Sequence, residues 1–178
     1  MGGLVLASRS PQRRAILEQL GIPFQAVEPA VEEVAEGDPR ELVVENARRK
    51  AGAVGGGLVL GVDTAVVLDG RAHGKPADRE EAAAVLRRLA GRDHEVLSGI
   101  ALSDGRTAIE GTRVRFRAID EGLLGWYLDT GEWRERAGGY AIQGRGAALV
   151  TGIEGDYLNV VGLPVAALLE LAPELLTR

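Results

Sequence analysis

One carboxylate stands inside an apolar stretch of this sequence. Asp63 lies within residues 58–68, where most of its neighbours are aliphatic. A buried carboxylate is unfavourable unless it is paired, hydrogen-bonded or bound to a cation. Asp63 is therefore a candidate metal ligand or general base. The alternative is a structural residue that accepts backbone N–H bonds in a turn.

The basic residues point to a second group. Of the 21 lysines and arginines, all are arginine except Lys50 and Lys75. Lysine carries a compact ammonium, whereas arginine carries a planar, forked guanidinium. Two isolated lysines therefore indicate sites that need a compact charge, as beside a phosphate. The alternative is that the two lysines occur by chance. Lys50 lies near the end of an expected helix and Lys75 follows an expected turn, so both can face one cleft. Together with Arg13 they would neutralise a triphosphate.

A polar loop joins the first expected strand to the first expected helix. Ser10 is the expected N-cap and Pro11 the first helical residue. The backbone N–H groups and the helix dipole at such a start favour an anion, and Ser8, Ser10 and Arg13 can donate hydrogen bonds to phosphate oxygens. The alternative is an ordinary capped helix with surface arginines.

An acidic segment after residue 24 offers oxygen ligands. Mg²⁺ and Mn²⁺ prefer hard oxygen ligands, and Asp63 with one glutamate of this segment would hold such an ion against a triphosphate. Charge runs are usually solvated surfaces, which is the alternative for the segment as a whole. The glutamates are Glu28, Glu32, Glu33 and Glu36.

Several familiar site signatures are absent from the sequence. It contains no Walker A loop, no G-x-S-x-G motif and no H-E-x-x-H motif. The two histidines, His73 and His94, are far apart and lack metal-ligand spacing. We therefore expect each histidine to be solvated or locally bonded rather than a metal ligand.

The elements that would position these residues alternate between strands and helices. Apolar runs and turn residues predict strands at 4–7, 58–68, 95–102 and 106–118. Capping residues predict helices that begin at Ser10, Asp38, Asp78 and Asp120, with a closing amphipathic helix at 164–176. Residues 139–155 are expected to form a glycine-rich hairpin and loop. The predicted fold class is α/β with a mixed, twisted sheet and flanking helices, in a single domain over residues 1–178.

Composition narrows the classes of partner. The formal net charge is −5, with acidic and basic residues interspersed, and aromatic residues make up only 4% of the chain. Neither feature suits binding to a nucleic-acid backbone or stacking on its bases. Cysteine is absent, so a metal would need oxygen or imidazole ligands. The apolar start is too short for a signal sequence or a membrane span, so we expect a cytoplasmic protein without a membrane partner.

An ordered set of short motifs makes the chain resemble the Maf family of nucleoside triphosphate pyrophosphatases. The motifs follow one another with the family's approximate spacing over nearly the whole sequence. They are Leu6-Ala7-Ser8-x-Ser10-Pro11-x-Arg13, Val31-Glu32-Glu33, Lys50-Ala51, Gly61-x-Asp63-Thr64, Gly74-Lys75-Pro76, Ala137-Gly138-x-Tyr140-x-Ile142-Gln143-Gly144 and Asn159-Val160-Val161-Gly162-Leu163-Pro164.

The resemblance implies a fold like that of the inosine triphosphate pyrophosphatases, with two lobes around a cleft. It also implies a homodimer that cuts the bond between the α- and β-phosphates of a nucleoside triphosphate with Mg or Mn as cofactor. Asp63 would be the proton acceptor and a metal ligand, and Glu33 a second metal contact. The residues implied to bind phosphate are Ser8, Arg13, Lys50 and Lys75.

Three positions in the family look like markers of base specificity. The branch similar to dTTP/UTP enzymes has Arg, Thr and Gln there, and the 7-methyl-GTP branch has Trp, Gln and Glu. This chain has Gln12, Thr64 and Gln143. Two of the three favour the dTTP/UTP branch, whereas Gln12 lacks the charged guanidinium expected at its position.

The sequence therefore predicts an enzyme that converts a nucleoside triphosphate, with dTTP and UTP favoured, to a monophosphate and pyrophosphate. The same family is associated with septum formation. The rival hypothesis is therefore a nucleotide-binding regulator of cell division whose hydrolysis is incidental. Asp63, Glu33 and two lysines together favour the enzyme, because a protein that only binds nucleotide would not need all of them.

Overall fold

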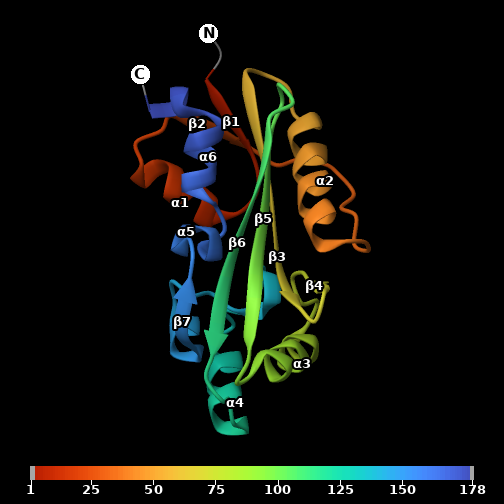
Figure 1. Cartoon of the computed structure of the whole chain (residues 1–178), viewed down its shortest axis with the longest axis vertical. Helices are drawn as coiled ribbons and strands as arrows, with labels where there is room; N and C mark the ends of the chain where they lie inside the picture. Colours follow the sequence, from red (N-terminus) through yellow and green to blue (C-terminus); the bar gives the residue numbers. More distant parts are fainter. Residues whose placement is uncertain (1–2, 177–178) are drawn as a thin grey trace.

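The computed structural model describes residues 3–176 and contains one mixed sheet. Its strand order is β2-β1-β3-β5-β6-β7, and the short β4 pairs with β3 (Figure 1). β1 runs parallel to both β2 and β3, and the other pairs are antiparallel. The strands are β1 (Leu4–Ala7), β2 (Phe24–Val27), β3 (Leu58–Leu68), β4 (Arg71–His73), β5 (Asp93–Leu102), β6 (Thr107–Phe116) and β7 (Val150–Glu154).

Helices flank the sheet, which confirms the α/β class expected from the sequence. The helix starts at Ser10, Asp38, Asp78 and Asp120 are also confirmed, because each of these side chains accepts a backbone N–H of its first turn. The α-helices are α1 (Pro11–Gln19), α2 (Pro39–Gly52), α3 (Arg79–Leu89), α4 (Glu121–Asp129), α5 (Tyr157–Val161) and α6 (Val165–Leu171). The 3₁₀ turns are η1 (Ala137–Gly139), η2 (Arg145–Leu149) and η3 (Pro173–Leu176).

Two sequence expectations about the second half of the chain are wrong. Residues 139–155 form a 3₁₀ turn and one strand, β7, which pairs with β6 instead of making a hairpin of its own. The closing helix stops at Leu171, because Pro173 cannot continue the hydrogen-bond ladder, and a 3₁₀ turn follows. The short strands β2 and β4 and the helix α5 were not expected.

Two hydrophobic cores lie along the same long strands. The terminal core, near both ends of the chain in Figure 1, packs α1 and α6 on the sheet. The second core packs α3 and α4 on the sheet at the other end of the molecule. We call it the middle core because its residues come from the middle of the sequence. Terminal-core residues include Leu6, Leu17, Leu60, Ile100, Leu163 and Leu168. Middle-core residues include Val66, Leu86, Val96, Val114, Leu124 and Leu149.

Helix α2 covers the opposite face of the sheet and lies unusually close to it. A Cβ on Gly61 would overlap the carbonyl oxygen of Ala47, and a Cβ on Gly99 would overlap the backbone of Val43. Only glycine at these two strand positions permits such an approach. The close packing brings the last turns of α2 over the middle of β3.

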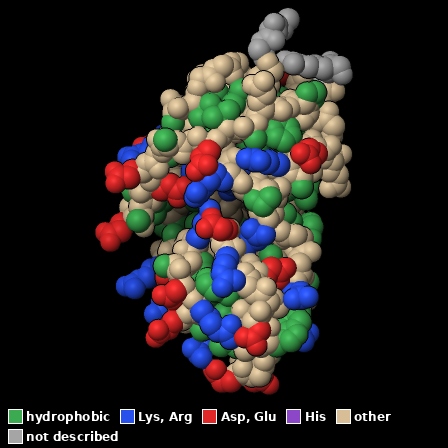
Figure 2. Space-filling model, turned by 180° about the vertical axis from the view of Figure 1, so that it is seen from behind, with side chains coloured by type: hydrophobic (Ala, Val, Ile, Leu, Met, Phe, Trp, Pro, Cys, Tyr) green, Lys and Arg blue, Asp and Glu red, His purple; other side chains and the backbone are tan. Residues whose placement is uncertain are grey.

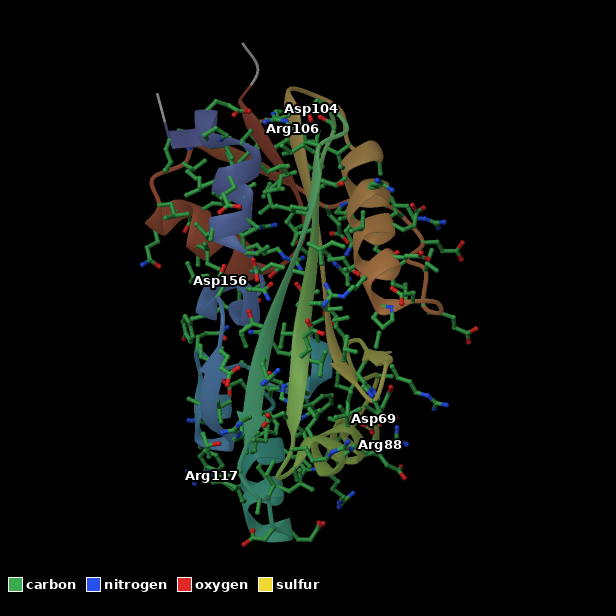
Figure 3. All side chains as sticks on the ribbon, viewed as in Figure 1. Asp69, Arg88, Asp104, Arg106, Arg117 and Asp156 are labelled. Carbon is green, nitrogen blue, oxygen red and sulfur yellow. The ribbon has the colours of Figure 1, made fainter. Side chains whose placement is uncertain are left out.

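The turn between β5 and β6 is tied to the C-terminal segment. Arg106 donates to the carbonyl of Leu171 at 2.6 Å, and its other N–H groups reach the carboxylates of Asp104 and Glu174, each at 2.7 Å (Figure 3). These contacts anchor α6 against the end of the sheet. Within residues 3–176, no helix is long and apolar enough to cross a membrane.

Candidate active site

A cleft of about 850 Å³ opens between the regions of the two cores. From behind the view of Figure 1, Lys, Arg, Asp and Glu side chains gather around a hollow at mid-height (Figure 2). The nine residues to which the family resemblance assigns a role in catalysis, binding or specificity all line this cleft. They are Ser8, Gln12, Arg13, Glu33, Lys50, Asp63, Thr64, Lys75 and Gln143.

Asp63 lies where β3 passes from one core to the other. Val62 belongs to the terminal core and Val66 to the middle core, whereas Asp63 and Thr64 between them are partly exposed. The turn interpretation of Asp63 is wrong, because the residue lies in the middle of a strand. Because successive strand residues face opposite sides of the sheet, Thr64 shares the face of Val62 and Val66, whereas Asp63 faces α2.

The Asp63 carboxylate is held by two side chains of α2. Lys50 Nζ donates to Asp63 Oδ1 at 2.8 Å, and Asn46 Nδ2 donates to Asp63 Oδ2 at 3.1 Å. Asn46 and Lys50 are four residues apart, so they share one face of the helix. Lys50 is only 7% exposed, and its partners therefore hold a buried ammonium. Both oxygens of Asp63 are fixed in direction.

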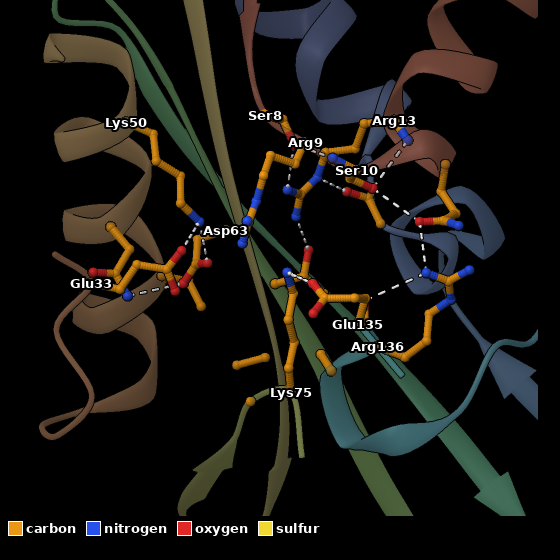
Figure 4. A pocket seen from close by; sticks show the side chains of 18 of the residues that line it. Ser8, Arg9, Ser10, Arg13, Glu33, Lys50, Asp63, Lys75, Glu135 and Arg136 are labelled. Atoms are coloured by element: carbon orange, nitrogen blue, oxygen red, sulfur yellow. Dashed lines mark hydrogen bonds and ion pairs between the residues drawn. The ribbon is translucent and has the colours of Figure 1, made fainter. Parts of the chain in front are cut away.

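Lys50 also holds a second carboxylate. Its Nζ lies 2.7 Å from Glu33 Oε1 and donates to the carbonyl of Val62 at 3.3 Å (Figure 4). Burial alone would raise the pKa of Glu33, but hydrogen bonding and attraction to Lys50, with smaller help from Lys75 and Arg13, lower it below its usual value. Glu33 is therefore an anion at neutral pH.

Asn46 positions the loop that carries Glu33. The backbone N–H of Val34 donates to Asn46 Oδ1 at 2.7 Å, and Asn46 Nδ2 donates back to the carbonyl of Val34 at 3.0 Å. The sequence analysis missed Asn46. A polar residue one turn before Lys50, on a helix face otherwise made of Val43, Ala47 and Ala51, was the available signal.

Of the acidic segment, Glu33 is the glutamate that meets Asp63 through Lys50. Glu28 lies at the cleft rim and pairs with Arg9 at 3.3 Å, with both side chains 63% exposed. Glu32 and Glu36 do not line the cleft. The segment is thus mostly a solvated surface, as the alternative interpretation held, with one member in the site.

The polar loop after β1 is organised by Ser8. This buried hydroxyl accepts hydrogen bonds from the Ser10 backbone at 3.1 Å and from Arg13 at 3.2 Å. A hydroxyl that accepts twice retains its own O–H for donation. The loop follows the carboxyl end of β1, where the chain crosses to opposite faces of the sheet through α1 and α2, and such switch points form ligand crevices.

Arg13 connects three segments at the floor of the cleft. Besides Ser8, its guanidinium donates to the carbonyl of Gly162 at 2.8 Å and to Thr64 Oγ1 at 3.1 Å. Burial lowers the pKa of Arg13, and the carboxylates of Asp63 and Glu33 oppose that effect, so the group stays cationic at neutral pH. The motif that contains Gly162 therefore helps to fix a cation near Asp63.

Lys75 faces the same cleft from the other side. It follows β4 and pairs with Glu135 at 3.0 Å, with the two side chains 54% and 70% exposed. Hydrogen bonding to Lys75 lowers the pKa of Glu135. The sequence analysis also missed Glu135 and its neighbour Arg136, which donates to Gln12 Oε1 at 3.0 Å. Charged residues in a loop gave no pattern by which to select these two.

His94 is locally bonded, as expected from the sequence. His94 is buried, and its Nε2 shares a 2.7 Å hydrogen bond with the hydroxyl of Tyr140. Burial lowers the pKa of His94 to about 4. Within the described part of the chain, no cluster of three or more His, Asp or Glu side chains could hold a metal ion.

The protein is of the α/β class, and its cleft brings cationic and carboxylate side chains together around Asp63 of β3. The chain belongs to the Maf family: the family model described as Maf-like protein matches residues 3–175. This match covers nearly every described residue, including both sides of the cleft.

Relatives with high identity carry one description. A dTTP/UTP pyrophosphatase from Pelotomaculum thermopropionicum is 50% identical, covering 96% of this chain and 95% of that protein. A dTTP/UTP pyrophosphatase from Symbiobacterium thermophilum is 51% identical, covering 93% and 90%. A more distant likeness is to the solved nucleoside-triphosphatase / dITP/XTP pyrophosphatase of Mycobacterium abscessus. It is 21% identical with a TM-score of 0.42, over 65% of this chain and 74% of that one, which is too remote to carry an argument.

Proposed function

We propose that this chain is a nucleoside triphosphate pyrophosphatase that converts dTTP and UTP to the monophosphate and pyrophosphate. The observation that carries the proposal is the contact of Lys50 with both Asp63 and Glu33 inside a cleft lined by further cations. The relatives described as dTTP/UTP pyrophosphatases support the same activity over nearly the full length of the chain.

The reaction needs a base at the α-phosphate. Asp63 accepts the proton of the attacking water as the water oxygen bonds to the α-phosphorus and the bond to the bridging oxygen of pyrophosphate breaks. The contacts with Asn46 and Lys50 keep the carboxylate oriented toward the cleft. The products are a nucleoside monophosphate, pyrophosphate and one proton.

The cations of the cleft hold the phosphates. Lys50, Lys75 and Arg13 offset the negative charge that grows on the leaving pyrophosphate, and the hydroxyl of Ser8 donates a hydrogen bond at the start of α1. Lys75 exchanges its exposed partner Glu135 for phosphate oxygens at little cost, because exposed ion pairs contribute only about 0–1 kcal/mol.

The carboxylates fit a hard divalent cation. Asp63 and Glu33 both contact the Lys50 ammonium, so two anionic oxygen donors face one region of the cleft, and a divalent cation there would bind beside Lys50. Mg²⁺ is commonly held by one or two carboxylates and completed by substrate phosphates, which matches a site with two. Mg or Mn bound there would supply charge stabilisation and favour ionisation of the attacking water.

Three cleft residues are assigned to the base. Thr64 is fixed by contacts with Arg13 and Ser98, Gln12 accepts from Arg136, and Gln143 lines the cleft with an exposed amide. An amide offers both a donor and an acceptor to the edge of uracil or thymine. These groups would select the pyrimidine while the lysines and Asp63 act on the phosphates.

The decisive measurement is product chromatography after incubation of dTTP or UTP with Mg or Mn. Monophosphate and pyrophosphate should be the first products. Diphosphate and orthophosphate as first products would move the attack to the γ-phosphate and refute the assignment. Binding of one nucleotide per chain without pyrophosphate release would instead support the rival, a nucleotide-binding regulator.

Three further features belong to the proposal. A homodimer, a cytoplasmic location and the lack of a nucleic-acid partner agree with the resemblance and with the net charge of −5. Light scattering on the purified chain tests the dimer, and a mass equal to 18.8 kDa would contradict it. Unchanged turnover in the presence of excess DNA or RNA tests the last feature.

A further inference from the structure

Arg136 lies at the opposite end of the cleft from Asp63 and Lys50 (Figure 4). Its NH1 group donates to Gln12 Oε1 at 3.0 Å, and the hydroxyl of Ser10 donates to the same oxygen at 3.1 Å. Because a guanidinium can only donate, the amide of Gln12 must present its oxygen to Arg136. This arrangement locks the orientation of the Gln12 amide and joins α1 to the loop before η1.

Part of the Arg136 guanidinium remains available. Its Nε is shielded from solvent and has no hydrogen-bond partner within the described residues. The second contact of NH1, to the carbonyl of Glu135, is long at 3.5 Å. The NH2 group makes no hydrogen bond to the described residues and is not shielded in this way, so it is the donor that a ligand in the cleft can reach.

The other cations that line the cleft are engaged differently. Lys50, Lys75 and Arg9 each form an ion pair with a carboxylate, and Arg13 donates from all three of its nitrogens. Arg136 is held by a neutral amide and keeps donor capacity. Its position away from Asp63 also separates it from the place where the α-phosphorus must react. The nucleoside extends from the α-phosphate, so a hydrogen-bonding end of the cleft away from Asp63 suits the base.

Donor-only chemistry separates uracil and thymine from cytosine. Uracil and thymine carry a carbonyl at C4, whereas cytosine carries an amino group there. The amide of Gln143 can rotate to match either ring, but a guanidinium has no acceptor and cannot pair with an amino group. A donor fixed opposite C4 therefore favours uracil and thymine, whose C4 carbonyl accepts, over cytosine, whose C4 amino group cannot.

We propose that Arg136 is a specificity-determining residue that donates to the C4 carbonyl of uracil or thymine, and that Gln12 is the positioning residue that holds it there. The inference rests on the proposed pyrophosphatase function. It also accounts for Gln12 in place of the arginine that the resemblance leads one to expect, because the guanidinium reaches this end of the cleft from position 136 instead.

The test compares pyrophosphate release from UTP, dTTP and CTP by the natural chain and by Arg136→Gln. The variant should lose roughly 10- to 100-fold in kcat/KM for UTP and dTTP, the range for one hydrogen bond to a charged group. The loss should appear in KM, with kcat changed by less than about threefold. The value for CTP should stay level or rise, so the ratio of UTP to CTP falls at least about tenfold.

Two controls separate base recognition from other roles. Inorganic tripolyphosphate has no base, so its inhibition constant should be the same for the natural chain and Arg136→Gln. Arg134→Gln removes an exposed arginine of the same loop that stacks on Trp133 at 4.7 Å and does not line the cleft. This variant should keep the natural ratio of UTP to CTP.

Two further variants keep the test informative if Arg136→Gln fails to fold. Arg136→Lys retains a donor without the planar fork, and Gln12→Met removes the acceptor that positions Arg136. Each should lower the ratio of kcat/KM for UTP to kcat/KM for CTP at least about threefold relative to the natural chain. Thermal unfolding of every variant shows whether a kinetic change reflects lost stability.

Several results would overturn the inference. One is a ratio of kcat/KM for UTP to kcat/KM for CTP near one in the natural chain. Others are equal losses of kcat/KM for all three nucleotides or weaker tripolyphosphate inhibition in Arg136→Gln. The last is a ratio that stays unchanged in Arg136→Lys and Gln12→Met. Failure of the proposed function looks different, because the natural chain would then release no pyrophosphate from any nucleotide. Calorimetric binding of UTP and CTP would in that case still test whether Arg136 prefers the C4 carbonyl.

Discussion

The regions around the terminal core and the middle core share three long strands but contribute to the cleft in different ways. The terminal region supplies side chains from α1, from α2 and from the loop after β1, and each has several protein partners. These side chains are Ser8, Arg13 and Lys50, which all make at least two contacts. The middle region supplies Lys75 and Gln143 from turns, with Lys75 in one exposed ion pair.

This difference separates two tasks of a nucleotide-hydrolysing site. Bond cleavage requires groups held within a fraction of an ångström, which the crowded contacts of α2 with β3 provide. Admission of substrate requires contacts that exchange readily, which exposed charges on turns provide. The terminal region should therefore control kcat and stability together, and the middle region should control binding with little effect on stability.

The largest expected effect follows from Asp63→Asn. The amide is close in shape but accepts protons poorly and binds cations weakly, so kcat should fall by roughly a hundredfold to ten-thousandfold. Asp69→Asn is the matched control, since Asp69 directly follows β3, is exposed and pairs with Arg92 at 2.6 Å outside the cleft. Comparison of pyrophosphate release by the two variants decides the role, and a natural kcat in Asp63→Asn would make the residue structural.

The next effect should come from Gly61→Ala. The new methyl group would overlap the carbonyl oxygen of Ala47, so α2 must move away with Lys50 and Asn46. Overpacking of this kind costs about 3 kcal/mol, and the displaced Lys50 should lower kcat as well. Urea unfolding and turnover measure the two losses.

Gly55→Ala is the control for that substitution. Gly55 precedes the same strand, and an added Cβ there meets no atom within 4 Å. If Gly55→Ala lowered stability as much as Gly61→Ala, the close approach of α2 would not be the cause. A Gly61→Ala variant with lower stability but natural kcat would show that α2 positions nothing in the reaction.

His94, which packs in the middle core, should make the free energy of unfolding depend on pH. His94 is buried with a pKa of about 4, below its value of 6.5 in the absence of burial. The unfolded chain therefore takes up a proton near pH 6.5 that the folded chain refuses until about pH 4, so stability falls as pH falls through this window. The loss should reach about 2 kcal/mol at pH 5.

His94→Gln should flatten that dependence, because glutamine does not titrate and can still bond to Tyr140. Urea unfolding of both chains at pH 7 and pH 5 gives the comparison, and the difference between chains removes the contribution of His73. Equal losses in the two chains would show that His94 is protonated in the folded state or does not dominate the acid response.

Sequence alone predicted the parts of this site that depend on local pattern. Apolar runs and capping residues predict the strand with Asp63, the helix start at Ser10 and a helix with Lys50 near its end. The structure confirms all three elements. Their convergence on one cleft came from the ordered motifs. The close contact of α2 with Gly61 could not be predicted, because its only trace in the sequence is the glycine itself.

Other parts depend on contacts that a linear pattern does not contain. β2 was missed because its side chains are mostly exposed at a sheet edge, so it lacks an apolar run. Glu135 was missed because its link to Lys75 spans 60 positions in the chain. Gly138, beside it, adopts a positive φ of 67° and donates to the carbonyl of Gly74 at 3.0 Å, which brings the two loops together.

The smallest expected effect separates the two regions most clearly. Lys75→Gln should lower kcat/KM about tenfold through KM, since one phosphate contact is lost, while the free energy of unfolding changes by less than about 0.5 kcal/mol. Arg79→Gln is the matched control, because Arg79 forms an exposed ion pair with Asp129 at 2.7 Å outside the cleft and should leave both quantities unchanged.

Glu135→Gln frees Lys75 from its competitor and should leave KM equal or lower. Steady-state kinetics with UTP and urea unfolding provide both numbers for each variant. A Lys75→Gln protein that loses several kcal/mol of stability would mean that the middle region is as tightly built as the terminal one, and a natural KM would remove Lys75 from the phosphate site.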